Sequence, residues 1–180
     1  NVMISNERLF DWNIVVALAV LEVLEMHEIQ KVSIKWPNDI MADSKKVGGI
    51  LIENVLKNGE SFDSVVGIGL NLNQTNFEHL PKATSLKSLT GKEYDIFVTA
   101  EEIAEKIQEK FQKLDELMPV FWIKYHEKLF KKDKPLAFED VKNNRFMGII
   151  QGVTHDGKLQ VMLEDDSISF FNIKEIQMLF

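Results

Sequence analysis

Two short stretches decide the fold of this chain: Lys35-Trp36-Pro37-Asn38-Asp39 and, a few residues later, Lys46-Val47-Gly48-Gly49. The first begins as an alternating strand from Val32 and is interrupted by Pro-Asn-Asp, which is turn chemistry. The second opens a strand over residues 47–56. The strong hairpin signal Asn58-Gly59 joins that strand to a partner strand over residues 64–72. A β-hairpin that begins and ends in glycine-rich sequence is therefore expected here.

The same stretches place cations, oxygen ligands and glycines at strand ends and turns. Lys35 and Lys46 are point charges suited to phosphate or carboxylate. Asn38 and Asp39 offer oxygen ligands for Mg²⁺, or an acid–base pair for an incoming amine. The glycines allow backbone N–H groups and a flat ligand to come close. Together these residues indicate nucleotide or acyl-phosphate chemistry.

Each of these elements also has an ordinary structural explanation. The Trp-Pro-Asn-Asp run can be only a turn, and Lys45-Lys46 can be a solvated hairpin tip. Gly67-Ile68-Gly69 can be a packed strand, since it lacks the third glycine and the phosphate-binding helix of a dinucleotide fingerprint. Their occurrence together, rather than any one of them, indicates a site.

Composition excludes several classes of protein. The 180 residues are 45% hydrophobic and 27% charged, which is typical of a globular chain. The net charge of −7 disfavours a reader of duplex DNA, which normally has a basic face. The absence of cysteine excludes disulfides, thiolate catalysis and cysteine metal sites. The longest apolar run, Ile14 to Leu21, is too short to span a bilayer.

Helices and further strands complete the predicted α+β architecture. We expect a short strand over residues 2–5 and helices near residues 11–26, 84–89, 103–117 and 119–130. Asp11 is the predicted cap of the first helix, Thr99 and Glu102 form a capping-box pattern, and Pro119 is placed in a first turn. The four histidines show no ligand spacing and are expected on the surface.

A change of composition follows at Lys131-Lys132-Asp133-Lys134-Pro135. Beyond it, short strands are expected at residues 136–141, 145–153, 159–163 and 168–173, separated by turns such as Asp156-Gly157. That spacing predicts a small β-barrel. We therefore place a domain boundary between residues 1–132 and residues 133–180.

The three glycine-containing stretches together resemble the biotin protein ligase family. The family shows a K-W-P-N-D element, a K-x-x-G-I-L-x-E element and a G-x-G-x-N element in this order and spacing. Here they are Lys35-Trp36-Pro37-Asn38-Asp39, Lys46-Val47-Gly48-Gly49-Ile50-Leu51-Ile52-Glu53 and Gly67-Ile68-Gly69-Leu70-Asn71-Leu72-Asn73. The similarity continues through Ala83-Thr84-Ser85-Leu86 and at Trp122. Lipoate ligases and lipoyl transferases share the fold but not the Trp-Pro-Asn-Asp sequence.

The resemblance implies a catalytic domain of the biotin/lipoate ligase type, then an SH3-like barrel. It also implies a two-step reaction, in which ATP activates biotin as biotinyl-5′-adenylate and a lysine of a biotin carboxyl carrier domain attacks the adenylate. The residues that it implies for each role are as follows: catalytic, Lys46, Asp39 and Lys35; biotin-binding, Lys46, Gly48, Gly49, Leu51, Gly67 and Leu70; ATP-binding, Lys35, Asn38, Ile68 and Asn71; metal, Asp39 for Mg²⁺.

The resemblance further implies a cytoplasmic enzyme that acts on a carrier domain of a carboxylase, as a monomer or a homodimer. No membrane or nucleic-acid partner is expected for this segment. The family's Gly-Arg-rich adenylate loop is expected to precede Asn1, so we expect these 180 residues alone to be weakly active or inactive. Two alternatives stay open: a non-catalytic biotin-binding or regulatory fragment, and a lipoate-type ligase on the same fold.

Overall fold

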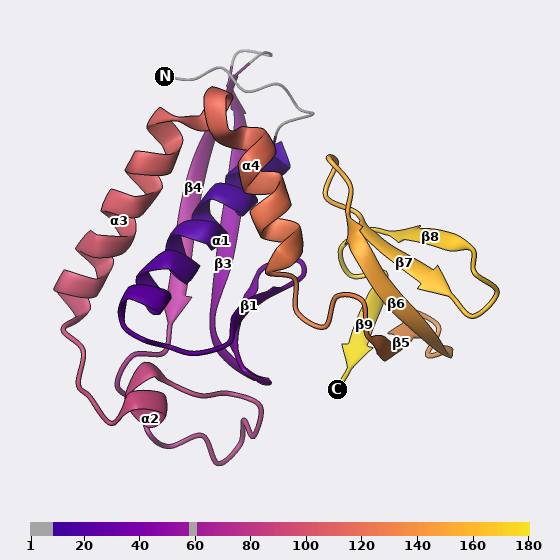
Figure 1. Cartoon of the computed structure of the whole chain (residues 1–180), viewed down its shortest axis with the longest axis horizontal. Coiled ribbons are helices and arrows are strands. Elements are labelled where there is room, and N and C mark those ends of the chain that lie inside the picture. The colour runs from indigo at the N-terminus through magenta and orange to yellow at the C-terminus, as the bar shows by residue number, and fades with distance from the viewer. Residues whose placement is uncertain (1–8, 58–60) are drawn as a thin grey trace.

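The computed structural model describes residues 9–57 and 61–180, and shows a mixed α+β chain with two antiparallel sheets and packed helices (Figure 1). The predicted strand over residues 2–5 and the Asn58-Gly59 turn lie outside the described residues. The elements follow in this order: α1 (Leu9–Met26), β1 (Val32–Lys35), β2 (Asp39–Ala42), β3 (Lys45–Lys57), β4 (Ser61–Leu70), α2 (Leu86–Thr90), α3 (Ile96–Gln112), α4 (Leu114–Glu127), β5 (Pro135–Asp140), β6 (Arg145–Val153), β7 (Leu159–Leu163), β8 (Ile168–Phe171) and β9 (Ile176–Leu179).

The first sheet has the strand order β1-β2-β3-β4, and every neighbouring pair is antiparallel. Its register aligns Lys35 with Asp39, Asp39 with Gly49, and Gly49 with Gly69. Directly paired residues project to the same face of a sheet. One row across all four strands therefore carries a lysine, an aspartate and two glycines on one face.

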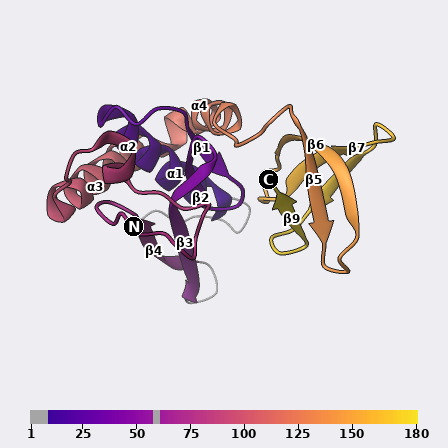
Figure 2. The same ribbon diagram turned by 90° about the horizontal axis from the view of Figure 1, so that it is seen from below.

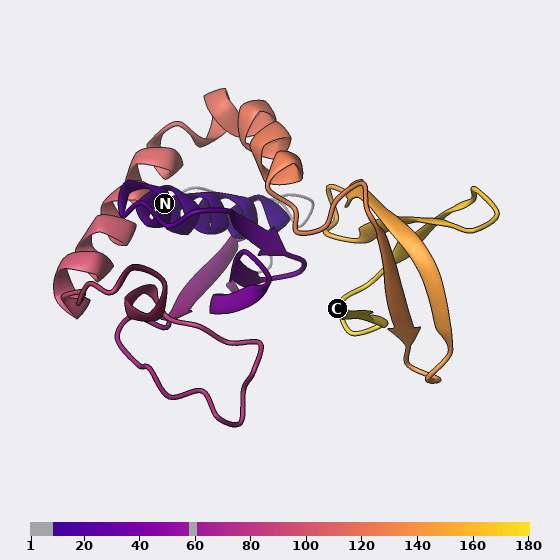
Figure 3. The ribbon, with the colours of Figure 1, turned by 60° about the horizontal axis from the view of Figure 1, so that its bottom comes forward.

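The opposite face of this sheet is covered by helices. Its strands contribute Ile34, Ile40 and Ile50, all buried, to a core shared with α1. Along its middle turns α1 is apolar on every side, which is the pattern of a helix with neighbours all round. In Figures 1 and 3, α1 lies along the sheet and α3 and α4 flank it. The helical layer thus fixes the sheet from one side.

Nothing in the described part of the chain covers the other face of β3 and β4. Figure 2 shows the helices on one side of these strands and no described helix on the other. Leu51 is 60% exposed and Val65 is 62% exposed on this face. We call this surface, carrying Lys35, Asp39, Gly49, Leu51 and Gly67, the open face.

Three helix starts differ from the prediction. Asp11, the predicted cap of α1, lies inside that helix, which already includes Leu9. Asp95, rather than Thr99, caps α3, because its Oδ1 accepts hydrogen bonds from the N–H groups of Phe97 and Val98 at 2.8 and 3.1 Å. Pro119 lies inside α4 rather than in its first turn, since the helix already begins at Leu114. Pro119 cannot donate a backbone hydrogen bond within the helix. Burial of Leu114 and the rest of the apolar helix face offsets the loss of that bond.

The second sheet has the strand order β8-β7-β6-β5-β9, and it is open. β9, which was not predicted, pairs with β5, and no pairing between β8 and β9 closes the sheet within the described residues. The predicted SH3-like barrel is therefore not confirmed. The boundary placed after residue 132 falls between α4 and β5 and stays a prediction.

The turn between β6 and β7 packs against the first sheet and its helices. Trp36 donates its indole N–H to the carbonyl of Gly157 at 2.9 Å, and Gly157 has a φ of +83°. A methyl group at Gly157 would lie 2.7 Å from Phe10 Cδ2. The turn therefore needs glycine both for its positive φ and for its close contact with Phe10. The rings of Trp122 and His155 are 4.5 Å apart. This turn joins the two sheets.

His27 and His126 correct the expectation of exposed histidines. The His27 side chain is 27% exposed, and its Nε2 lies 2.7 Å from Glu102 Oε2. His126 is half-buried beneath β6, where its Nε2 lies 3.1 Å from the Val153 nitrogen and 3.0 Å from the Val153 carbonyl oxygen. Desolvation lowers the pKa of His126, the hydrogen bond with the Val153 backbone opposes this shift, and the nearby charges of Lys132 and His155 add to it, so that the net shift is downward. His79, in contrast, is exposed as expected.

No helix in the described part of the chain combines the length and the apolar character needed to cross a membrane.

Candidate active site

One carboxylate joins two lysines at the end of the open face. Asp39 Oδ2 lies 3.0 Å from Lys35 Nζ, and Asp39 Oδ1 lies 2.5 Å from Lys46 Nζ. The Asp39 side chain is 19% exposed and that of Lys46 is 48% exposed. The cluster carries a net charge of +1 beside open solvent. It can thus receive an anion without any buried group having to move.

A β-bulge brings Lys46 into this cluster. Ile40 pairs with Gly48 but the next residue, Met41, pairs with Lys46, so that Val47 is the extra residue of β3. Strict alternation would send Lys46 to the same face as Gly48, towards the helices. The bulge instead turns the Lys46 side chain to the face of Asp39 and leaves Val47 fully buried. The sequence pattern pointed to Lys46, and the bulge explains how its side chain reaches Asp39.

The turn that carries Asp39 is fastened to β3 by Asn38. The Asn38 side-chain Nδ2 donates to the Ile50 carbonyl at 2.6 Å, and the Ile50 N–H donates to the Asn38 carbonyl at 2.9 Å. These two bonds hold the Trp-Pro-Asn-Asp turn against the strand that supplies Lys46. Asn38 therefore has a structural role in addition to any contact with a nucleotide.

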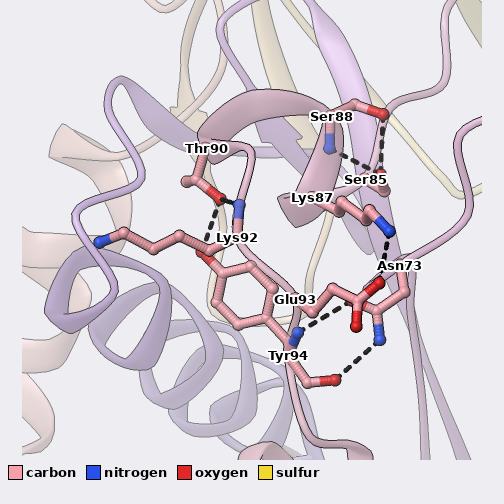
Figure 4. A network of polar contacts seen from close by, with 8 residues as sticks. All are labelled: Asn73, Ser85, Lys87, Ser88, Thr90, Lys92, Glu93 and Tyr94. Atoms are coloured by element: carbon pink, nitrogen blue, oxygen red, sulfur yellow. Dashed lines mark hydrogen bonds and ion pairs between the residues drawn. The ribbon is translucent and has the colours of Figure 1, made fainter.

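Asn71 is used in a similar way at the end of β4. Its Nδ2 donates to the Thr84 carbonyl at 3.0 Å, and its Oδ1 accepts from Gln74 Nε2 at 2.7 Å. Beyond it, Asn73 exchanges two hydrogen bonds with the backbone of Tyr94, at 2.7 and 2.9 Å. Figure 4 shows how this network continues through the capping Ser85 and α2. The segment after β4 is therefore held firmly beside the site.

The glycines of this region do two different things. A methyl group at Gly48 would lie 2.6 Å from the Gly69 carbonyl oxygen, so Gly48 is required by the contact between β3 and β4. At Gly67 the nearest atom is the Leu51 carbonyl oxygen at 3.7 Å, which leaves the surface flat and the backbone reachable. Gly49 lies between these cases, with Lys46 Nζ at 3.4 Å. Only the glycines of the open face leave room for a ligand.

Three of the predicted ligand residues, Gly48, Ile68 and Leu70, lie on the other side of the sheet. The side chains of Ile68 and Leu70 pack against the core and line a cavity of about 200 Å³ beneath α3, together with Ile103. Their alternation in β4 places them opposite Gly67 and Gly69. The structure thus brings Lys35, Asp39, Lys46, Gly49, Leu51 and Gly67 to one face, but not Gly48, Ile68 or Leu70.

Two residues that sequence reasoning missed also border the site. The Lys82 carbonyl accepts the N–H of Lys46 at 2.7 Å, and Lys82 Nζ donates to the Phe180 carbonyl. The Phe180 ring lies 4.6 Å from Lys82 Nζ and 5.5 Å from Lys35 Nζ. The match at Ala83-Thr84-Ser85 pointed to the neighbourhood of Lys82, but no local pattern marks Phe180.

Comparison with known proteins agrees with these motifs. Residues 4–71 match the model of the Biotin/lipoate A/B protein ligase family. The chain is 27% identical over 161 residues to the bifunctional ligase/repressor BirA of Salmonella typhimurium, a match that covers 87% of this chain and 49% of that protein. The chain thus spans about half the length of this curated relative.

Solved structures agree as well. The crystal structure of biotin protein ligase from Aquifex aeolicus has a TM-score of 0.78 at 28% identity, covering 96% of this chain and 76% of that one. The same enzyme in complex with biotin and ATP has a TM-score of 0.76 at 27% identity, covering 96% and 72%. The resemblance stated from the sequence is confirmed.

Proposed function

We propose that this homologue of the biotin protein ligases activates biotin with ATP and transfers it to a lysine of a biotin carboxyl carrier domain. The observation that carries the proposal is the bridging of Lys35 and Lys46 by Asp39 at the edge of a flat glycine-bearing face. Two cations and one base, each fixed to a different strand, suit a reaction that first builds negative charge and then receives an amine.

In the first step a carboxylate oxygen of biotin attacks the α-phosphorus of ATP. The new bond joins oxygen to phosphorus, and pyrophosphate leaves. Negative charge grows on the phosphorus oxygens, and positioned cations stabilise such a transition state. Lys46 is the more exposed of the two lysines, so it is the one that turns to the carboxylate and phosphate, while Lys35 stays on Asp39.

In the second step the amine of the carrier lysine attacks the acyl carbon of the mixed anhydride. The carbon–nitrogen bond forms, AMP leaves, and the amine loses one proton. Asp39 already holds an ammonium group at 2.5 Å, so its carboxylate has the geometry to hold the incoming amine and accept that proton. Departure of Lys46 to the phosphate in the first step makes this position available.

We assign the biotin ring to the open face. Gly49, Gly67 and the exposed Leu51 offer a flat, apolar surface, and Lys46 stands at its end near the expected carboxylate. The part of Leu70 in biotin binding, and of Ile68 in ATP binding, can come only from their backbone atoms, since their side chains face the helices. Gly48 has no side chain and can likewise contribute only its backbone. Asn38 and Asn71 shape the nucleotide side through their hydrogen-bonded turns.

Magnesium fits this site as a companion of ATP. Mg²⁺ is usually bound by one or two carboxylates together with substrate phosphates and water. Asp39 can supply one such oxygen once a lysine has left it. No group of three or more His, Asp or Glu side chains in the part of the chain that the structure describes forms a metal cage. When bound, the ion supplies charge neutralisation on the phosphates.

The proposal includes a cytoplasmic location and a carboxylase carrier domain as the acceptor, with the protein acting as a monomer or a homodimer. Two other functions compete with it: binding of biotin without catalysis, and ligation of lipoate. The biotin/lipoate breadth of the matching family model keeps the second alternative open.

The test is biotin-dependent exchange of labelled pyrophosphate into ATP, measured on the natural full-length protein, followed by transfer to a carrier domain. We expect exchange with biotin and not with lipoate, and a loss of about 100-fold or more in Lys46→Met. Lys45→Met, at the neighbouring exposed lysine, is the matched control. Binding of biotin without exchange, or exchange driven by lipoate, would overturn the proposal in favour of the corresponding alternative.

A further inference from the structure

One aromatic ring, on the residue that follows the last strand of the second sheet, lies close to two lysine ammonium groups at the site. The Phe180 ring centroid is 4.6 Å from Lys82 Nζ and 5.5 Å from Lys35 Nζ, and 5.0 Å from the centroid of Phe130. Both ammonium groups are within the distance at which the quadrupole of an aromatic face attracts a cation. We call Phe180 with its two lysines the Phe180 clamp.

Backbone hydrogen bonds fix the segments on either side of the ring. The Phe130 N–H donates to the Ile34 carbonyl at 2.8 Å, which places Phe130 beside the end of β1 and hence beside Lys35. The Lys82 carbonyl accepts the N–H of Lys46 at 2.7 Å, which places Lys82 beside the start of β3. The clamp therefore connects the two strands that supply the lysines of the site.

The ring itself arrives from the far end of the chain. Leu179, its neighbour in β9, pairs with Ala137 of β5, so the second sheet sets the position of Phe180. The second sheet thereby reaches the phosphate side of the site through one side chain. No other cation–π contact in the described residues involves a lysine of the Lys35–Asp39–Lys46 cluster.

We propose that Phe180 is a positioning residue, whose ring holds the ammonium groups of Lys35 and Lys82 on the phosphate side of the site. The proposal rests on the proposed function. Lys35 pairs with Asp39 at 3.0 Å, and the Phe180 ring lies 5.5 Å from the same ammonium group, so that two contacts restrict this long side chain. A lysine restricted in this way loses less conformational entropy when ATP binds.

The variant Phe180→Leu keeps the apolar packing on Phe130 and removes the aromatic face, whereas Phe180→Tyr keeps both. We expect Phe180→Leu to lower kcat/KM for ATP about two- to fivefold, the range of an exposed to partly buried cation–π contact. The KM for biotin stays unchanged, and Phe180→Tyr restores kcat/KM. Phe170→Leu, at a half-exposed aromatic of the same sheet, is the matched control.

A spectroscopic measurement tests the clamp without any turnover. Lysines carrying ¹³C-methyl groups at Nζ are observed by NMR, and the signals of Lys35 and Lys82 are assigned with Lys→Arg variants. We expect ring-current shifts at these two signals that disappear in Phe180→Leu and persist in Phe180→Tyr. The signal of the exposed Lys45 serves as the reference.

The two measurements separate the possible failures. Signals of Lys35 and Lys82 that do not respond to Phe180→Leu would overturn the clamp, and so would signals that respond while kcat/KM for ATP stays at the wild-type value. In a Lys35→Met, Lys82→Met background, Phe180→Leu should have no further effect; an undiminished loss would assign Phe180 a merely structural role. Absence of biotin-dependent exchange in the wild-type protein would instead contradict the proposed function.

Discussion

Gly49 lies directly opposite Asp39 in the β2–β3 pair, and a methyl group built on Gly49 would lie 3.4 Å from Lys46 Nζ and 3.6 Å from Asp39 Oδ1. The ion pair between Lys46 and Asp39 thus occupies the space above a residue that has no side chain. Substitutions at Gly49 report on how much that space matters.

We predict that Gly49→Val lowers the rate of adenylation by at least tenfold, because its branched side chain displaces the Lys46 ammonium. Gly49→Ala, which makes only ordinary contacts, should have a smaller effect. The measurement is pyrophosphate exchange by the full-length protein. If Gly49→Val acts through Lys46, adding it to Lys46→Met should cause little further loss. Additive losses would place its effect elsewhere.

Substitution of Gly48 should lower the stability of the protein rather than the rate of its reaction. A methyl group there would lie 2.6 Å from the backbone oxygen of Gly69, and backbone atoms cannot move away as side chains do. We predict that Gly48→Ala lowers the free energy of unfolding by about 1–3 kcal/mol, as overpacking typically does. Gly67→Ala, where the nearest atom is 3.7 Å away, is the matched control in denaturant unfolding. Equal midpoints for the two variants would contradict the prediction.

Trp36 and Trp12 form a matched pair for measuring the hydrogen bond from Trp36 to Gly157. In Trp36→Phe the Gly157 carbonyl loses its buried donor, and we expect a loss of about 1–3 kcal/mol in the free energy of unfolding. The Trp12 indole N–H is buried without a hydrogen-bond partner, and Trp12 stacks on Phe111. Trp12→Phe removes an unpaired donor and keeps an aromatic ring.

We therefore expect Trp12→Phe to lower stability less than Trp36→Phe does. Chemical denaturation of both variants under the same conditions measures the difference. An equal or larger loss in Trp12→Phe would show that ring volume, rather than the hydrogen bond, decides the contribution of Trp36.

His126 makes the contact between α4 and β6 sensitive to acid. Its pKa is lower in the folded than in the unfolded chain, chiefly through desolvation, so the unfolded chain binds more protons. The stability that depends on neutral His126 is complete above the ordinary pKa of about 6.5 and is lost as the pH falls through the lower folded value. The Val153 carbonyl, 3.0 Å from Nε2, can accept the proton of the charged ring and so reduces this effect without reversing it.

The measurement is the free energy of unfolding between pH 5 and pH 8. We expect a decrease towards pH 5 in the wild-type protein and a shallower decrease in His126→Gln. His79→Gln, at an exposed loop histidine, should follow the wild type. Identical slopes for all three proteins would exclude His126 as the source of the pH dependence.

Much of the fold followed from local patterns. The long hairpin of β3 and β4 was predicted from two glycine-containing stretches and the turn signal between them, and the grouping of Lys35, Asp39 and Lys46 in one site was predicted from motif resemblance. These features depend on residues close in sequence. Successive residues of a strand project to opposite faces of the sheet. Applied to β4, this rule predicts that Ile68 and Gly67 lie on opposite faces, as they do.

Other features depend on residues far apart and left no local signal. The bulge at Val47 follows from pairing with β2, and the place of Phe180 follows from the pairing of β9 with β5. The start of α3 was misplaced because Thr99 and Glu102 match the capping box, whereas Asp95 makes the capping bonds four residues earlier. The open second sheet likewise reflects which strands pair, which strand spacing alone does not determine.

The bond between Trp36 and Gly157 also orders events during synthesis. A ribosome completes the turn that carries Asp39 well over a hundred residues before it adds the glycine that anchors that turn. The four strands and α1 can form on the nascent chain, because domains generally fold as they emerge. A translation product released before Gly157 would nevertheless hold Trp36 without its acceptor. Completion of the turn that carries Asp39 is therefore a late step in the production of this protein.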